Sequence, residues 1–231
     1  MLDLANVDAF YGASRALQDV SLSVGKGEFL AVLGRNGVGK TTLMRTILGL
    51  MDRVMGSIKL DGRDILALRT DQRAKAGIGY VPQGRGILPR FTVRENLVLG
   101  TFAAKQPLRE VPEWVFQMFP ILKDFQNRYG GNLSGGQQQQ LAIARALLSE
   151  PKVILLDEPT EGIQPNIVEE IEDVVTRLNR ERGLTIVLVE QDVAFARRAS
   201  TRFLILEKGS VAAEGPVSAL SDDIVHRHMA V

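Results

Sequence analysis

The sequence predicts an α/β protein built on a parallel sheet, and three apolar runs carry this prediction. Residues 29–33, 153–156 and 185–189 are nearly continuous stretches of apolar side chains, as expected for strands covered on both faces. The second and third runs follow segments with the spacing of amphipathic helices, at residues 137–148 and 167–180. Strands that alternate with helices in this order form parallel sheets with crossover helices.

A second, antiparallel sheet is expected at the N-terminus. Residues 2–8 and 18–24 alternate apolar and polar side chains, which is the period-two pattern of half-exposed strands. The pattern places Tyr11-Gly12 in the connection between them. We interpret this pair as an antiparallel β-subdomain beside the parallel sheet.

An inserted helical subdomain is expected over residues 84–149, where four prolines separate short amphipathic segments. The length of 231 residues favours one domain over residues 1–231. In this interpretation residues 1–83 and 150–231 form the core with the β-subdomain. The four glutamines Gln137–Gln140 are expected to be solvated residues of a first helical turn.

The composition argues against several classes of function. The formal net charge is +1, so no basic surface for nucleic acid or anionic lipid is indicated. Cysteine is absent, which removes disulfides and thiolate metal sites. The sequence has neither a signal-peptide pattern at its start nor an uncharged stretch approaching the roughly 20 apolar residues of a membrane span. Any membrane association is therefore expected to need a partner.

A glycine-rich loop follows the first apolar run and opens an amphipathic helix over residues 41–50. It matches the pattern G-x-x-x-x-G-K-[ST], whose glycines let backbone N–H groups point at phosphate oxygens while the helix N-terminus adds about half a positive charge. An ordinary glycine-rich turn is the alternative. We expect Lys40 to contact the β- and γ-phosphates of ATP and Thr41 to bind Mg²⁺. The candidate phosphate-binding residues are Gly34, Arg35, Asn36, Gly37, Val38, Gly39, Lys40, Thr41 and Thr42.

Two acids end the second apolar run. Asp157 and Glu158 are expected at the carboxyl edge of the parallel sheet, where ligands bind in open α/β folds. Asp157 suits a contact to Mg²⁺, and Glu158 is the candidate to orient or deprotonate the water that attacks the γ-phosphate. Taken alone, two acids after a strand fit a polar loop equally well, and it is the phosphate loop that favours catalysis.

The segment Leu133–Gln137, which reads LSGGQ and precedes a helix, resembles the signature motif of ATP-binding-cassette (ABC) ATPases. The resemblance covers essentially the whole chain. It implies a P-loop NTPase (RecA-like) core in which two such domains dimerise head to tail, and each ATP lies between one subunit's phosphate loop and the other's signature. As a simpler alternative, Ser134 is only a helix N-cap. The candidate ATP-binding residues of the signature are Ser134, Gly135, Gly136 and Gln137.

The same resemblance assigns two further residues. Tyr11 matches the aromatic residue that stacks on adenine, and a core aromatic is the alternative. Gln83 matches the glutamine that senses the γ-phosphate or Mg²⁺ at the junction with the helical insert, and a surface amide is the alternative.

Two departures from the family pattern are evident. Gln191 stands where most members have a histidine that contacts the γ-phosphate. A glutamine can donate an amide hydrogen bond but cannot carry a proton between pH 5 and 8, so we expect Gln191 to position groups and not to act as an acid or base. The segment Glu161–Pro165 replaces a loop that usually contains aspartate, which leaves its contact across the dimer open.

These departures, together with Gly84-Arg85 and the four glutamines, resemble the branched-chain amino-acid and amide importer subfamily, most closely its urea-type members. The resemblance implies transmembrane permease subunits and a second ABC ATPase subunit, identical or not, as partners, and indirectly a substrate-binding protein. It places the chain peripherally on the cytoplasmic face of the inner (cell) membrane. Two alternatives stay open: a soluble ABC ATPase outside transport, and a nucleotide-gated switch with little turnover.

Overall fold

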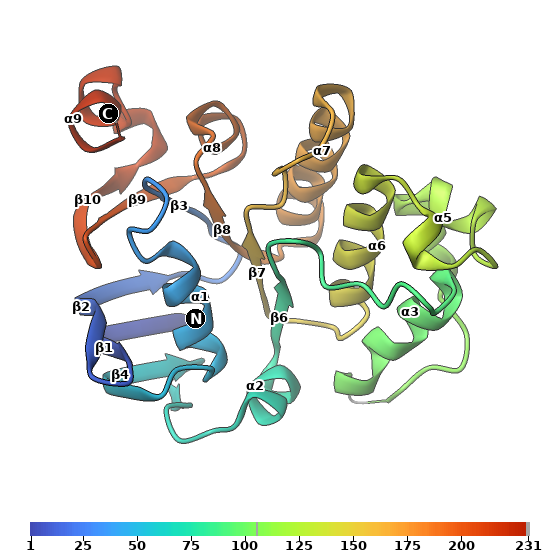
Figure 1. The fold of residues 1–231 in the computed structure, drawn as a ribbon, viewed down its shortest axis with the longest axis horizontal. Helices are drawn as coiled ribbons and strands as arrows, with labels where there is room; N and C mark the ends of the chain where they lie inside the picture. The colour runs from blue at the N-terminus through green and yellow to red at the C-terminus, as the bar shows by residue number, and fades with distance from the viewer. Residues whose placement is uncertain (105, 230–231) are drawn as a thin grey trace.

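The computed structural model describes residues 1–104 and 106–229, which form two β-sheets and the helices around them (Figure 1). In the view of Figure 1 the smaller sheet lies at the lower left and the larger sheet passes through the centre. The helices of the middle of the chain, drawn in green and yellow, gather at the right.

The smaller sheet is antiparallel and has the strand order β2-β1-β4-β5. Its strands are β1 (Leu2–Tyr11), β2 (Ser14–Val24), β4 (Arg53–Leu60) and β5 (Arg63–Asp64). The predicted N-terminal pair is confirmed, whereas β4 and β5 are not anticipated by the sequence patterns. The prediction that Tyr11 lies in the connection is wrong: it is the last residue of β1 and pairs with Ser14, because a two-residue turn is enough to join these strands.

The larger sheet has the order β10-β9-β3-β8-β7-β6, with β10 antiparallel to β9 and the other neighbours parallel. Its strands are β3 (Phe29–Leu33), β6 (Ile78–Val81), β7 (Val153–Asp157), β8 (Thr185–Glu190), β9 (Arg202–Glu207) and β10 (Ser210–Pro216). The predicted parallel sheet is confirmed. Strands β7 and β8 each end in an acid, Asp157 and Glu190, so both carboxyl groups belong to the sheet's edge.

Alternate residues of the buried strands pack on opposite faces of this sheet. Leu30 and Val32 of β3 join a core shared with the antiparallel sheet and helix α1 (Lys40–Leu48). On the other face, Phe29 packs in a core shared with helices α6 (Gly135–Leu147) and α7 (Pro165–Arg182). This double coverage is the physical reason for the continuous apolar runs in the sequence.

The predicted insert is largely helical. Helices α3 (Val93–Gly100) and α5 (Pro120–Asp124) both pack against α6. Apolar side chains of α3, α4 (Glu113–Met118), α5 and α6 share one core. The remaining helices, besides α8 (Val193–Ala199), are α2 (Thr70–Ala76), α9 (Asp222–Met229) and the 3₁₀ turns Thr101–Ala103, Gly130–Asn132 and Val217–Ala219.

The prediction that the four glutamines of α6 are solvated is wrong for Gln139 and Gln140, which are buried, while Gln137 and Gln138 are half-buried. Gln139 is only 2% exposed and Gln140 is also buried, with its Nε2 donating to Glu170. Gln138 accepts a hydrogen bond from Arg85 and donates to backbone carbonyls. The prediction fails because α6 contacts β6, α3, α5 and α7, so most of its surface is covered.

Helix α7, with 18 residues, is the longest helix in the described part of the chain. All of its acids except Glu181 lie in its first half, and its arginines lie in its second half. The helix ends at Gly183, which has the left-handed conformation that favours glycine. Within residues 1–104 and 106–229, no helix has the length and apolar character needed to cross a membrane.

Candidate functional site

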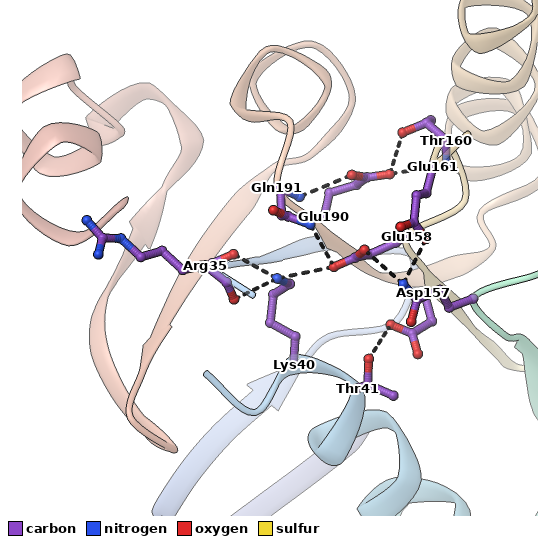
Figure 2. Close-up of polar contacts among 11 residues, drawn as sticks. Arg35, Lys40, Thr41, Asp157, Glu158, Thr160, Glu161, Glu190 and Gln191 are labelled. Carbon is purple, nitrogen blue, oxygen red and sulfur yellow. Dashed lines mark hydrogen bonds and ion pairs between the residues drawn. The ribbon is translucent and has the colours of Figure 1, made fainter. Parts of the chain in front are cut away.

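The phosphate loop and the predicted acids meet at the carboxyl ends of β3, β7 and β8 (Figure 2). The loop leaves β3 and enters α1, Asp157 ends β7, and Gln191 follows β8. Since β3, β8 and β7 are adjacent parallel strands, their carboxyl ends share one edge of the sheet. A cleft of about 320 Å³ opens there, lined by Asn36, Gly37, Gly39, Lys40, Thr41, Thr42, Gln83 and Glu158.

The loop conformation depends on glycine at two positions. Gly34 and Gly39 have φ angles of +149° and +111°, a region that residues with a Cβ rarely adopt. A Cβ on Gly34 would lie 2.6 Å from the carbonyl oxygen of Leu206. Gly39 is the N-cap of α1, and no side chain caps the helix. The first-turn N–H groups of α1 therefore remain available to an anion in the cleft.

Lys40 is 4% exposed and is held by the loop itself. Its Nζ donates to the carbonyl oxygens of Gly34 at 2.7 Å and Arg35 at 3.0 Å. The same Nζ lies 3.2 Å from Oε1 of Glu158. The ammonium group is thus fixed at the cleft and paired with the predicted catalytic carboxylate.

Two predicted loop residues direct their side chains elsewhere. Val38 packs against the apolar core beneath the loop. The side chain of Arg35 points away from Lys40 in Figure 2, and its Nε donates to the carbonyl oxygen of Met229 at 3.3 Å. Only the backbone groups of these two residues remain for phosphate binding.

Asp157 is fully buried and has two hydrogen-bond donors. Thr41 Oγ1 donates to Oδ1, and the Tyr80 hydroxyl donates to Oδ2, each at 3.2 Å. Burial raises the pKa of the Asp157 carboxyl, and these two hydrogen bonds only partly oppose the rise. Burial, with the neighbouring Asp157 charge, also raises the pKa of Tyr80. The carboxylate is therefore undercompensated, as expected for a group that binds a cation.

The residues present fit Mg²⁺. A hydroxyl oxygen of Thr41 and a carboxylate oxygen of Asp157 lie side by side, and Mg²⁺ prefers such hard oxygen ligands. No group of three or more His, Cys, Asp or Glu side chains in the described ranges is arranged to hold a metal. Further ligands would come from a nucleotide's phosphates, water and the predicted ligand Gln83. A bound Mg²⁺ would supply positive charge against the phosphates.

Glu158 receives three polar contacts besides its backbone bonds. Oε1 accepts from Gln191 Nε2 at 3.2 Å and pairs with Lys40, while Oε2 accepts from Gln83 Nε2 at 3.4 Å. Gln83 Nε2 also donates to Glu161 at 2.7 Å. The sequence-predicted residues Lys40, Gln83, Glu158 and Gln191 are therefore brought together around one carboxylate.

Comparison with known proteins gives the family. The model of the family described as "ABC transporter" matches residues 17–161. The chain belongs to the ABC transporter ATP-binding family. This membership makes it an ATPase, and it agrees with the phosphate loop, the strand-end acids and the LSGGQ segment, all of which lie within the matched residues.

Individual relatives agree with this membership. The chain is 39% identical over 221 residues to the high-affinity branched-chain amino acid transport ATP-binding protein BraG of Pseudomonas aeruginosa, covering 95% of the chain and 94% of that protein. It is 37% identical to the probable branched-chain amino acid transport ATP-binding protein LivF of Archaeoglobus fulgidus, covering 95% and 94%. Among solved structures, the dimeric ATP-binding cassette MJ0796 bound to ADP and Pi is similar, with a TM-score of 0.83, 32% identity, and 94% and 99% of the two chains covered.

The signature residues of this ABC ATPase do not reach its own phosphate loop. Ser134 caps α6: its Oγ accepts from the Gln137 backbone N–H at 3.4 Å, and Gln137 Oε1 accepts from the Ser134 N–H at 3.0 Å. Both line a separate pocket of about 430 Å³. Gly136 has a packing role of its own, because a Cβ there would lie 2.1 Å from Cγ2 of Ile167.

Tyr11 also lies apart from the cleft lining. Its side chain is 39% exposed, and the Arg45 guanidinium of α1 lies 5.4 Å from its ring centroid. The exposed ring at the end of β1 is not a core aromatic. Its stacking on adenine stays a prediction.

The sequence analysis did not identify two residues of the ABC ATPase site, Tyr80 and Glu190. Tyr80 hydrogen-bonds Asp157, as described above. Glu190 accepts hydrogen bonds from Thr160, and it is buried at the end of β8. The available signal for Glu190 was its position: it ends a buried strand in the same way as Asp157, at the same edge of the sheet.

Proposed function

We propose that ATP is hydrolysed in the cleft between the phosphate loop and the strand-end acids. The observation that carries the proposal is the convergence of Lys40, Thr41, Asp157 and Glu158 at one sheet edge, with the bare N-terminus of α1 beside them. The triphosphate binds over the helix N-terminus, where N–H groups and the helix dipole stabilise negative charge. The Lys40 ammonium group then leaves the Glu158 carboxylate and binds the β- and γ-phosphates instead.

This exchange releases the Glu158 carboxylate for the attacking water. Glu158 accepts the proton as water attacks the γ-phosphate, and the bond from the γ-phosphorus to the bridging oxygen of ADP breaks. Gln83 and Gln191 hold the carboxylate through their amide N–H groups. Gln191 has no proton to transfer near neutral pH, so it positions Glu158 without acting as an acid or base.

A second ATPase subunit, identical or not, completes the site. Ser134 and its neighbours lie in a pocket that shares no residue with the phosphate cleft of the same chain. The similarity to a cassette solved as a dimer with ADP and Pi supports a head-to-tail pair in which each signature faces the other subunit's phosphate loop. The N-terminus of α6 is the positive end of its helix dipole, and the hydroxyl of Ser134 at that end supplies a hydrogen-bond donor for an anion.

The insert at residues 84–149 transmits the change to a permease. An apolar groove of about 510 Å³ separates α1 and α2 from α3 and α6, and it is lined by Leu50, Leu88, Leu99 and Ala103, among others. Leu50 and Leu88 are exposed apolar side chains. We place the permease contact in this groove, because closure around nucleotide would alter the spacing of its walls.

The absence of cysteine offers a direct test of this contact. A single cysteine at Leu50 would be the only thiol of the chain, and it should form crosslinks to a co-expressed permease carrying cysteines in its cytoplasmic loops. A cysteine at Asp19, on the β-subdomain, is the matched control. Equal crosslinking at both positions would contradict the assignment of the groove.

The cargo we propose is a small amino acid or amide: branched-chain amino acids, or urea and short amides. Similarity to BraG and LivF supports the amino-acid class, and the urea type rests on the resemblance of Gly84-Arg85, the four glutamines and Glu161–Pro165. The chain then works on the cytoplasmic face of the inner membrane with permeases and a substrate-binding protein. Proteoliposomes holding the complex should accumulate either labelled leucine or labelled urea when ATP is present on the ATPase side.

Two outcomes would contradict this function. ATP-dependent uptake of neither solute, with intact ATP hydrolysis, would reject the cargo class. No phosphate release by the purified chain, with or without permease, would favour the nucleotide-gated switch that Gln191 suggests.

A further inference from the structure

Glu190 is a buried acid that the proposed hydrolysis does not use. It is 4% exposed at the end of β8, directly before Gln191 (Figure 2). One carboxyl oxygen, Oε1, accepts from Thr160 Oγ1 at 2.6 Å and from the Thr160 backbone N–H at 3.3 Å. The other, Oε2, accepts from the Gln191 backbone N–H at 3.1 Å. Both oxygens are therefore engaged as acceptors.

The contacts of Glu190 connect it to residues on two sides of Glu158. Gln191, whose backbone Glu190 holds, donates through Nε2 to Oε1 of Glu158 at 3.2 Å. Thr160, which Glu190 holds on the other side, lies two residues after Glu158 in the chain. Glu190 thus links the segment that follows β7 to the segment that follows β8, and Glu158 lies between the two points of attachment.

The backbone at Glu158 needs such support. Its φ is +46°, the left-handed region that residues with a Cβ rarely occupy, and its N–H donates to the Val189 carbonyl at 2.9 Å. Unfavourable backbone conformations persist only where surrounding contacts hold them. Loss of the Thr160 contacts would allow the segment to relax and carry the Glu158 carboxylate with it.

The chemistry of the contacts requires a carboxylate. Three donors, two of Thr160 and one of Gln191, point at two oxygens, whereas an amide offers only one oxygen and adds donors of its own. Burying a carboxylate is costly, and these three hydrogen bonds offset part of that cost.

We propose that Glu190 is a positioning residue that sets the Glu158 carboxylate and the Gln191 amide in the geometry required for hydrolysis, without contacting nucleotide itself. The inference rests on the proposed role of Glu158. In this proposal Glu190 aligns the segments that follow β7 and β8. Removal of the Glu190 carboxylate should therefore impair turnover and leave nucleotide binding intact.

The first test is the variant Glu190→Gln, assayed for phosphate release and for binding of a fluorescent ATP analogue. Misplacement of a reacting group by about 1 Å can cost on the order of a hundredfold, so we expect kcat to fall about tenfold to a hundredfold. The KM for ATP and the Kd of the analogue should stay within about twofold, because the phosphate loop is untouched.

Glu172→Gln is the matched control. Glu172 is also a buried acid, but it lies on α7, pairs with Arg198 and makes no contact with the cleft. Its replacement should lower the melting temperature and leave kcat unchanged. The fraction of folded protein is measured for both variants. If the loss of kcat in Glu190→Gln is no larger than its loss of folded protein, as in Glu172→Gln, the proposal is wrong.

A double-mutant cycle tests the mechanism and does not depend on the stability of Glu190→Gln alone. Thr160→Val removes the hydroxyl donor, keeps the shape of the side chain, and should lower kcat in the same direction. The double variant should be no slower than the more impaired single variant, because both changes break the same link. Multiplicative losses, or a wild-type kcat for both single variants, would overturn the proposal.

Glu158→Gln is measured in parallel to separate two failures. If Glu158→Gln retains wild-type turnover, the proposed catalytic role of Glu158 is wrong, and the role of Glu190 falls with it. If Glu158→Gln is inactive while Glu190→Gln turns over normally, only the inference about Glu190 is wrong.

Discussion

The ammonium of Lys40 lies 3.2 Å from Oε1 of Glu158, and both side chains are almost fully buried. Each group therefore compensates the charge of the other. Removing one member of a buried pair leaves an uncompensated charge, which is generally costly. The proposed nucleotide binding offers Lys40 a second anionic partner, so we expect Lys40 to leave Glu158 when the triphosphate binds.

Replacing Lys40 by alanine should abolish productive nucleotide binding. The variant loses the cation of the cleft and leaves Glu158 without its partner, so negative charge would face the incoming triphosphate. We expect the affinity for an ATP analogue to fall by at least about a hundredfold, equivalent to roughly 3 kcal/mol. Fluorescence titration measures this. Lys152→Ala, which removes an exposed lysine paired with Asp61, should bind normally.

Replacing Glu158 by glutamine should separate binding from hydrolysis. The amide keeps the size of the side chain and removes the charge that competes for Lys40, so ATP should bind at least as well as in the wild type. Loss of a general base typically costs about a hundredfold to ten-thousandfold in rate. Size-exclusion chromatography with light scattering should detect an ATP-dependent dimer. Wild-type turnover in this variant would reject the general-base assignment.

The parallel sheet and the phosphate loop were predictable because they depend on local patterns. The runs at residues 29–33, 153–156 and 185–189 are apolar because both faces of the sheet are covered, and glycines in the loop meet a backbone requirement. Strand β4 was harder to predict from the sequence, because Gly56 interrupts the alternation of apolar and polar residues. A glycine is needed there because the β1 backbone approaches closely. The local sequence was therefore enough to predict a strand where all residues of the strand are buried.

The contacts of Glu190 could not be predicted in the same way. Its bond to Thr160 joins residues separated by 30 positions, and it exists because β7 and β8 are neighbours in the sheet. The sequence predicts that these strands are parallel but does not fix their order. The prediction that Gln139 is solvated is wrong for a related reason. Its burial depends on how many other elements cover α6, which the local sequence does not show.

Arg73 should be a major contributor to stability. Its side chain is 2% exposed, and burial lowers the pKa of its guanidinium. The guanidinium donates to four carbonyl oxygens, those of Thr46, Ile47, Leu66 and Leu68. Methionine would fill part of the space but leave these acceptors unpaired, so Arg73→Met should lower the free energy of unfolding by about 3 kcal/mol.

Urea unfolding measures this loss, with Arg69→Met as the control. Arg69 pairs with Asp71 on the surface, and both side chains are exposed, so its replacement should change stability by less than about 1 kcal/mol. Equal losses in the two variants would show that the buried donors of Arg73 are not the source of the effect.

The stability of the protein should depend on the ionisation of Glu190. Burial raises the pKa of the Glu190 carboxyl above its ordinary value of 4.5, although hydrogen bonds from Thr160 and Gln191 oppose the rise. An acid with a higher pKa in the folded state than in the unfolded state contributes stability that is fully present below the unfolded value. That contribution is lost as the pH rises through the folded value.

Glu190→Gln removes this component, because the amide does not ionise. The free energy of unfolding of the wild type, relative to the variant, should therefore decrease as the pH rises from about 4.5 through the raised pKa. Urea unfolding at closely spaced pH values checks the slope, and Glu110→Gln, at an exposed acid, corrects for the general effect of charge. A difference that stays constant over this range would mean that Glu190 has the same pKa in the folded and unfolded states.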